Sequence, residues 1–190
     1  VPMATSLEDL ERVIVAQRQS GMNYMMMETA KYHAHFIEAQ ELYQAGKLGQ
    51  IQFMRGCHYQ DLEAINPLWR GLPPMWYMTH AVTPLLDLLD TQAAEVCCFG
   101  SGTMRPEFHA PYGNPYPIET ALFTLRNHPA RMEITRSLFE TAVQCEEAFD
   151  FYGTLGSYQT IGRPTLFTEI APLRKTGEER AIKTTTLPWR

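Results

Sequence analysis

A single histidine, His80, lies where a proline-rich aromatic segment meets a leucine-rich run, in the stretch PPMWYMTHAVTPLLDLLD. Histidine exchanges protons near neutral pH, so a histidine at the start of a helix is a candidate acid–base group. Tyr77 comes three residues earlier and could supply a hydroxyl beside it. The structural alternative for His80 is a ring bonded to nearby backbone, and for Tyr77 an aromatic packed under the proline-rich loop.

Aromatic and cationic side chains extend this candidate site. Trp69, Trp76 and Tyr59 could stack on a sugar or another ring, although aromatic residues are also ordinary core material. Arg105 and Arg70 could hold an anionic substrate group with a bidentate guanidinium, or could simply be solvated. We therefore include Trp69, Tyr59 and Arg105 among the candidate substrate-binding residues.

A second group of candidates follows the apolar run 24–27, for which we predict a buried strand. Residues beyond the carboxyl end of a strand in an open α/β sheet line the ligand crevice. Glu28, Thr29, Lys31 and Tyr32 occupy that position. The alternative is a plain loop between a strand and a helix.

His33 and His35 raise a metal alternative, because an H-x-H pair just after a strand begins the metal site of some barrel hydrolases. Here the pair falls at the start of a predicted helix, where side chains at i and i+2 diverge. His58, His109 and the scattered acidic residues offer no matching spacing. We predict no metal ligands and keep a metal hydrolase as the third hypothesis.

Composition restricts the class of partner. The 190 residues are 45% hydrophobic and 19% charged, with a net charge of −5 and no block of lysine and arginine, which argues against nucleic acid and anionic membrane as partners. No apolar run approaches the roughly 20 residues that span a bilayer. The 4 cysteines show no C-x-x-C pair, so we expect reduced thiols in a cytoplasmic protein.

Periodicity predicts helices in the first half of the chain and strands in the second. Thr5 with Glu8 fits a capping box that opens a helix ending at Gly21, and the apolar positions 7, 10, 13, 14 and 16 form one stripe. Further helices are predicted at 33–45 and 81–89, and strands at 51–60, 95–100, 119–126, 131–138, 148–152 and 157–160. The predicted fold class is α+β: a mostly antiparallel open sheet with helices packed on one face.

The order of these elements resembles the end of the Rossmann domain and the following domain of Gfo/Idh/MocA-type oxidoreductases. Pro2 and the helix over 5–16 are similar to the family's proline motif and the helix after it. The stretch ELYQAGKLGQI at 41–51, Thr79-His80 and the turn Gly153-x-x-Gly156 are similar to later family motifs. The resemblance covers nearly the whole chain.

The resemblance implies a parent of two domains, with a nicotinamide-binding Rossmann half mostly outside this chain. Residues 1–30 would be a helix–strand remnant of that half, and residues 31–190 the C-terminal substrate and oligomerisation domain. NAD or NADP would be the cofactor, with Pro2, Thr29 and Lys31 beside it. Family members commonly pair through the open sheet face, so we expect a homo-oligomer.

Two positions depart from the family pattern. The family's catalytic lysine precedes the proline, where this chain has Val1, and its usual aspartate lies four residues before the histidine, where this chain has Trp76. His80 is retained. Lys31 or Tyr32 could partly replace the missing lysine, and Tyr77 could replace the aspartate.

Two hypotheses from different classes follow. In the first, the parent is an NAD(P)-dependent dehydrogenase acting on a sugar, polyol or related small molecule. His80 would be its acid–base group, and the substrate would lie among Glu28, Tyr32, Tyr77 and Trp69. In the second, the domain is a non-catalytic assembly or binding module whose sheet face is lined by residues such as Thr120, Leu122, Arg136 and Phe149.

Overall fold

The computed structural model describes residues 2–63, 69–109, 112–143, 145–162, 164–171 and 181–188. Its α-helices are α1 (Leu7–Ser20), α2 (Ala34–Gln44) and α3 (Thr79–Leu88). Short 3₁₀ turns are η1 (Thr29–Tyr32), η3 (Pro74–Tyr77) and η4 (Pro106–Phe108).

Strands of the described residues form a single sheet in the order β2-β3-β4-β1-β5-β6-β7-β8. Their bounds are β1 Ile51–Tyr59, β2 Ala93–Ser101, β3 Ile118–Leu125, β4 His128–Ser137, β5 Glu146–Gly153, β6 Gly156–Gln159, β7 Leu166–Ile170 and β8 Ile182–Thr186. Neighbouring strands are antiparallel except β1 and β4, which run parallel. The predicted α+β class and mostly antiparallel sheet are therefore confirmed.

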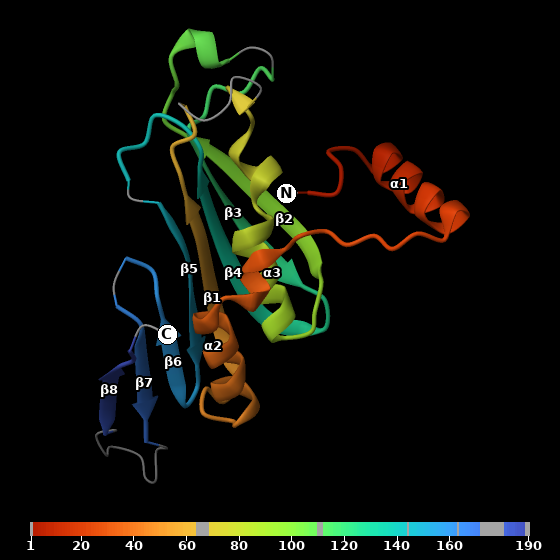
Figure 1. Cartoon of the computed structure of the whole chain (residues 1–190). Coiled ribbons are helices and arrows are strands. Elements are labelled where there is room, and N and C mark those ends of the chain that lie inside the picture. The colour runs from red at the N-terminus through yellow and green to blue at the C-terminus, as the bar shows by residue number, and fades with distance from the viewer. Residues whose placement is uncertain are drawn as a thin grey trace.

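Helices α2 and α3 cover one face of the central strands (Figure 1). The main core lies between them and the sheet, and its fully buried members include Phe36 of α2, Leu85 of α3 and Met132 of β4. Gly56 of β1 faces α3, and a Cβ placed there would lie 2.4 Å from the Ala81 carbonyl oxygen. This glycine therefore lets the start of α3 approach the sheet backbone.

The parallel pair β1–β4 determines which polar residues meet beneath α3. Its register places His58 opposite Arg136. Side chains alternate between faces along a strand, so both residues share the helix-covered face with Met54 and Met132. This finding corrects one assignment: Arg136 and Phe149 do not line the open face, because both are buried on the side of the helices.

The N-terminal segment differs from its prediction in two respects. Ser6 caps α1 in place of Thr5, since its hydroxyl accepts a hydrogen bond from the Asp9 N–H, while Gly21 ends the helix as predicted with φ 66°. The strand predicted at 24–27 is wrong: residues 21–28 form neither helix nor strand. A short apolar run forms a strand only where a neighbouring strand pairs with it, and none of the described strands does so.

Helix α1 has no buried residue and stands away from the sheet (Figure 1). Its predicted apolar stripe is therefore not part of the core, and Leu7 is 80% exposed. The expected domain boundary at residue 30 stays a prediction.

The C-terminal tail contains two strands that periodicity did not predict, β7 and β8. β8 is polar and exposed, so it lacks the apolar alternation that reveals a half-buried strand. None of the helices among the described residues is long and apolar enough to span a membrane.

We expect Gly56→Ala to destabilise the fold by about 1–3 kcal/mol, because the added methyl group must push α3 off the sheet. Urea unfolding followed by circular dichroism measures this change. Gln52→Ala, at an exposed position of the same strand, is the control and should be close to neutral. Equal stability of the two variants would contradict the close contact.

Candidate functional site

His80 lies in the first turn of α3, immediately after the 3₁₀ turn η3. Pro74 begins η3, where its fixed φ suits the first helical position. Pro84 lies deeper in α3 than predicted, because the helix begins at Thr79. Proline has no N–H to donate to the carbonyl four residues earlier, so residue 84 gives no helical hydrogen bond to the His80 carbonyl.

Glu28 and His80 form a buried carboxylate–imidazole pair. The distance from His80 Nδ1 to Glu28 Oε1 is 2.6 Å, and the two residues are 8% and 7% exposed. Burial alone would raise the pKa of Glu28. The hydrogen bond and charge of His80 outweigh burial, with help from the Thr79 hydroxyl and the Ala30 N–H, and the pKa of Glu28 falls below its usual value.

The ionised carboxylate defines the tautomer of His80. Glu28 only accepts hydrogen bonds when ionised, so His80 Nδ1 carries a hydrogen, and Nε2 is an acceptor whenever the ring is uncharged. The Tyr77 hydroxyl lies 3.3 Å from Nε2 and donates to it in that form. Burial raises the pKa of Tyr77 against the opposing charge of Arg136, which keeps the phenol protonated at neutral pH. The described geometry is thus a chain from Tyr77 through His80 to Glu28.

Arg136 supplies a buried positive charge beneath this chain. It is 0% exposed and donates to the carbonyl oxygens of Tyr77, His58 and Ser137 at 2.7–2.8 Å. A further hydrogen bond runs to the side chain of Gln60. The guanidinium also lies 4.9 Å from the centre of the Tyr77 ring. All these hydrogen-bond acceptors are neutral, and no carboxylate of the described residues forms an ion pair with Arg136.

His58 of β1 is buried and lies next to His80. The two rings are 5.4 Å apart, and His58 Nε2 lies 3.4 Å from Glu147, whose other oxygen is 3.6 Å from His33. Burial, aided by the charge of Arg136, lowers the pKa of His58 to about 2. His58 is therefore neutral at physiological pH, and its buried Nδ1 has no hydrogen-bond partner among the described residues.

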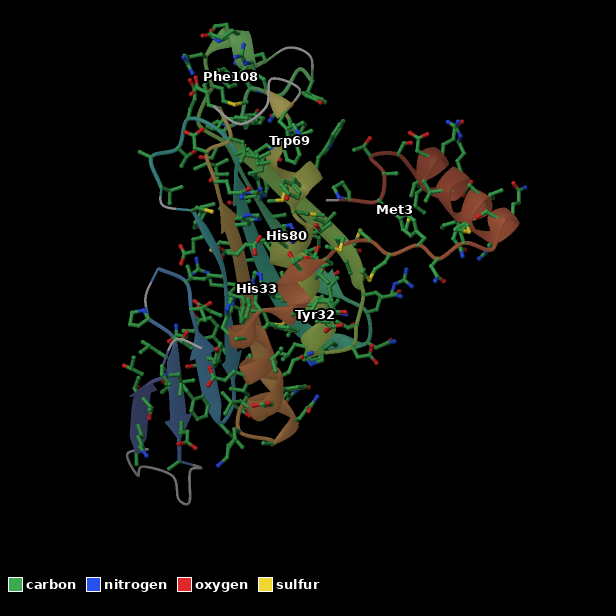
Figure 2. All side chains as sticks on the ribbon, in the orientation of Figure 1. Met3, Tyr32, His33, Trp69, His80 and Phe108 are labelled. Atoms are coloured by element: carbon green, nitrogen blue, oxygen red, sulfur yellow. The ribbon has the colours of Figure 1, made fainter. Side chains whose placement is uncertain are left out.

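Of the aromatic and arginine candidates, the structure brings only Trp69 to this cluster. Its ring lies 5.2 Å from that of Tyr77, and Trp69 lies above His80 in the view of Figure 2. Tyr59 follows His58 in β1, so the alternation of the strand directs it to the opposite face. Arg105 bonds Glu63 and Glu140 and lies over Phe108, so acids of two other loops engage its guanidinium.

The residues after Glu28 lie at the edge of the site. Lys31 forms an ion pair of 2.7 Å with Asp87 of α3, so its charge is already engaged. Tyr32 is 75% exposed, and Thr29 begins η1. Pro2 is half-buried ahead of α1, and Val1 lies outside the described residues. Trp76, at the family's aspartate position, is exposed and contacts the Tyr112 ring.

The two histidines of the H-x-H pair pack against aromatic rings. His35 stacks on Phe149 at 4.9 Å, and burial lowers its pKa to about 4. The described part of the chain contains no group of three or more His, Cys, Asp or Glu side chains arranged to hold a metal ion. A cavity of about 580 Å³ lies beside His35, Cys145 and Glu147, and His80 does not line it.

Sequence reasoning missed His58 and Arg136 as members of the site. Both lie on predicted strands, but their contact depends on the parallel pairing of β1 and β4, whose partners are 78 residues apart. Period-2 alternation identifies the face of each strand and says nothing about which strands are neighbours. An arginine at an alternating apolar position, between Ile134 and Leu138, was the available signal.

No protein-family model matches this chain, and no curated protein matches it in sequence. Solved structures do match it. An NAD-binding oxidoreductase of Klebsiella pneumoniae has 16% identity and a TM-score of 0.72 over 97% of this chain and 52% of its own. The UDP-N-acetylglucosamine 3-dehydrogenase of Acidithiobacillus ferrooxidans has 14% identity and a TM-score of 0.67, and the match covers 100% of this chain and 56% of that protein. The apo scyllo-inositol dehydrogenase of Lactobacillus casei has 14% identity and a TM-score of 0.70, and the match covers 86% of this chain and 48% of that protein.

The chain therefore spans about half the length of these structures. It has the fold of the C-terminal halves of Gfo/Idh/MocA-type oxidoreductases, which confirms the sequence resemblance at the level of the fold. Identities of 14–16% establish that fold and do not transfer a substrate.

The buried neutral His58 predicts a stability that depends on pH. Its pKa of about 2 in the folded state lies below the value of about 6.5 in the unfolded chain, so the unfolded state binds more protons between these values. The free energy of unfolding is therefore highest above pH 6.5. It falls as the pH is lowered, by about 1 kcal/mol per pH unit from this residue.

Urea unfolding from pH 7.5 to pH 4.5 measures this dependence. His58→Gln removes the titrating ring and should flatten the slope, whatever its effect on stability at pH 7.5. His128→Gln, at the first residue of β4, is the control and should keep the slope of the wild type. An unchanged slope in His58→Gln would contradict the buried neutral state.

Proposed function

We propose that this chain is the substrate-binding and proton-transfer half of an NAD(P)-dependent oxidoreductase that acts on a hydroxyl group of a sugar, polyol or related small molecule. The observation that carries the proposal is the buried pair of Glu28 and His80 on a fold shared with sugar and inositol dehydrogenases. Oxidation of an alcohol requires a base for the hydroxyl proton, and an imidazole with an unprotonated Nε2 is such a base.

Glu28 makes His80 a better proton acceptor and holds its ring in place. An imidazole that accepts a proton on Nε2 becomes a cation, and the carboxylate 2.6 Å from Nδ1 stabilises that cation. The same hydrogen bond fixes the tautomer and the orientation of the ring. The distance is short and both groups are shielded from water, so this stabilisation is stronger than that of an exposed ion pair.

A nicotinamide dinucleotide, when bound, supplies the hydride chemistry that complements this base. The described residues contain no strand, glycine-rich turn and helix of the dinucleotide-binding kind, so the group would be held mainly by residues outside them. Thr29 and Lys31 of η1 remain candidates for contact with it, and η1 packs against α3. The ion pair with Asp87 would then orient η1, and Lys31 would not act as the family's catalytic lysine.

The aromatic rings around Tyr77 suit a substrate with alternating polar and apolar faces. Trp69 and Tyr77 meet edge to face, and the exposed Trp76 follows a similar arrangement with Tyr112. Aromatic rings bind the apolar faces of sugar rings while nearby polar groups bond the hydroxyls. This combination favours a cyclic polyol or sugar over a fully apolar alcohol.

Assembly through the open sheet face is the second candidate function, and it is compatible with the first. Leu122 of β3 is 50% exposed and Phe99 of the neighbouring strand β2 is 66% exposed, so apolar side chains meet solvent on paired strands. Exposed apolar patches of this kind mark interaction sites in soluble proteins. We propose a homo-oligomer formed through this face.

We expect His80→Ala to lower turnover by ~10²-fold or more, as for the loss of an acid–base group. Glu28→Gln should also lower turnover, because the amide does not stabilise the imidazolium as a carboxylate does. Reduction of NAD⁺ and NADP⁺ by the full-length protein, followed at 340 nm with a panel of aldoses and cyclic polyols, measures both effects. His128→Ala is the control. Wild-type turnover in His80→Ala would remove this residue from the mechanism.

Leu122→Glu should dissociate the oligomer, because it places a charge on the apolar part of the open sheet face. Sedimentation velocity of the purified protein reports the change in mass. Leu7→Glu introduces the same charge at an exposed leucine of α1 and is the matched control. A monomeric wild-type protein would contradict the proposed assembly.

A further inference from the structure

Both ring nitrogens of His80 are already engaged by protein groups. Nδ1 bonds Glu28 at 2.6 Å, and Nε2 accepts the Tyr77 hydroxyl at 3.3 Å. The ring itself is buried, with a side chain that is 7% exposed. A substrate hydroxyl would reach Nε2 directly only by displacing the phenol.

Tyr77 is the more accessible end of this chain. It is half-buried, whereas His80 and Glu28 are buried, and it lies on the 3₁₀ turn η3 and not within α3. Its hydroxyl bonds the buried imidazole, and Tyr77 is the least buried residue of the three. A phenol of a half-buried residue that bonds a buried base is placed to pass a proton between that base and a bound molecule.

Tyr77 is also held firmly, which a proton-transfer group requires. Its carbonyl oxygen accepts a hydrogen bond from Arg136 Nε at 2.8 Å, and the guanidinium of Arg136 lies 4.9 Å from the centre of its ring. Trp69 contacts the ring edge to face on another side. Backbone and ring are thus fixed by separate contacts, and the charge of Arg136 favours negative charge on the phenol oxygen.

From these contacts we propose that the Tyr77 phenol, and not the His80 imidazole, is the catalytic residue that exchanges the proton with the substrate hydroxyl. His80 and Glu28 form the relay behind it. This inference rests on the proposed function and specifies which atom of the site touches the substrate.

The O–H bond of the substrate breaks and its proton passes to the Tyr77 oxygen, while the original Tyr77 proton moves along its hydrogen bond to His80 Nε2. The imidazole becomes an imidazolium that remains paired with the Glu28 carboxylate. The C–H bond of the substrate would break with its electron pair, and a bound oxidised nicotinamide dinucleotide would accept this hydride. The alcohol would thereby be oxidised to a carbonyl compound and the dinucleotide reduced.

The test compares Tyr77→Phe with Tyr116→Phe in the full-length protein. Both variants lose one phenol oxygen, and Tyr116 lies on the loop before β3, outside the cluster. The reaction is the reduction of NAD⁺ or NADP⁺ with the most active aldose or cyclic polyol of the panel. Tyr77→Phe should lower kcat by ~10²-fold or more with little change in KM, since the aromatic ring and its packing remain. Tyr116→Phe should keep the kcat of the wild type.

The outcomes separate this inference from the proposed function. A Tyr77→Phe variant with more than a third of the wild-type kcat would overturn the inference, and His80 would then exchange the proton directly after displacing the phenol. A rise in KM at unchanged kcat would also overturn it and make Tyr77 a binding group only. Absence of any dinucleotide-dependent turnover in the wild type would instead refute the proposed function, and with it this inference.

Discussion

The hydrogen bond between Glu28 and His80 joins the segment after α1 to the first turn of α3, across 52 residues of sequence. Without the carboxylate, His80 would be a buried ring with no fixed tautomer, and without the imidazole, Glu28 would be a buried acid whose pKa rises instead of falling. Each group therefore offsets the free-energy cost of burying the other. The position of η1 against α3, and of α3 against β1 at Gly56, brings the two groups together.

Around this pair the interior is unusually polar for the space between a helix and a sheet. Arg136 is buried among carbonyl oxygens, and burial lowers its pKa to about 10, so it stays charged at neutral pH. A buried cation with neutral partners costs free energy, and proteins retain such groups where they serve a site or a specific packing. Burial, together with this charge, keeps His58 neutral, and the guanidinium also contacts the Tyr77 ring, so one residue of β4 influences two neighbours of His80.

The sequence predicted most helices and strands well, but it did not predict which of them pack or pair with one another. The strand β1 was predicted almost to its ends, because nine residues alternate between the two faces. Residues 24–27 were wrongly assigned to a strand, since a short apolar run does not reveal whether a partner strand exists. Polar β8 gave no pattern to detect.

Glu28, Tyr77 and His80 were each named as candidates from their types and positions, but their mutual bonds depend on tertiary packing. Arg136 was placed on the wrong face because the parallel register of β1 and β4 is not visible in either strand alone.

The nitrogen-15 NMR spectrum of the His80 ring tests the central claim most directly, because it reports which nitrogen carries the hydrogen. Selective assignment by comparison with His80→Gln identifies the signals in the purified protein at neutral pH. The account predicts a protonated Nδ1 that bonds Glu28 and an unprotonated Nε2 that accepts from Tyr77. A ring protonated on Nε2 with a bare Nδ1 would contradict it, since the imidazole would then have no lone pair directed toward the phenol.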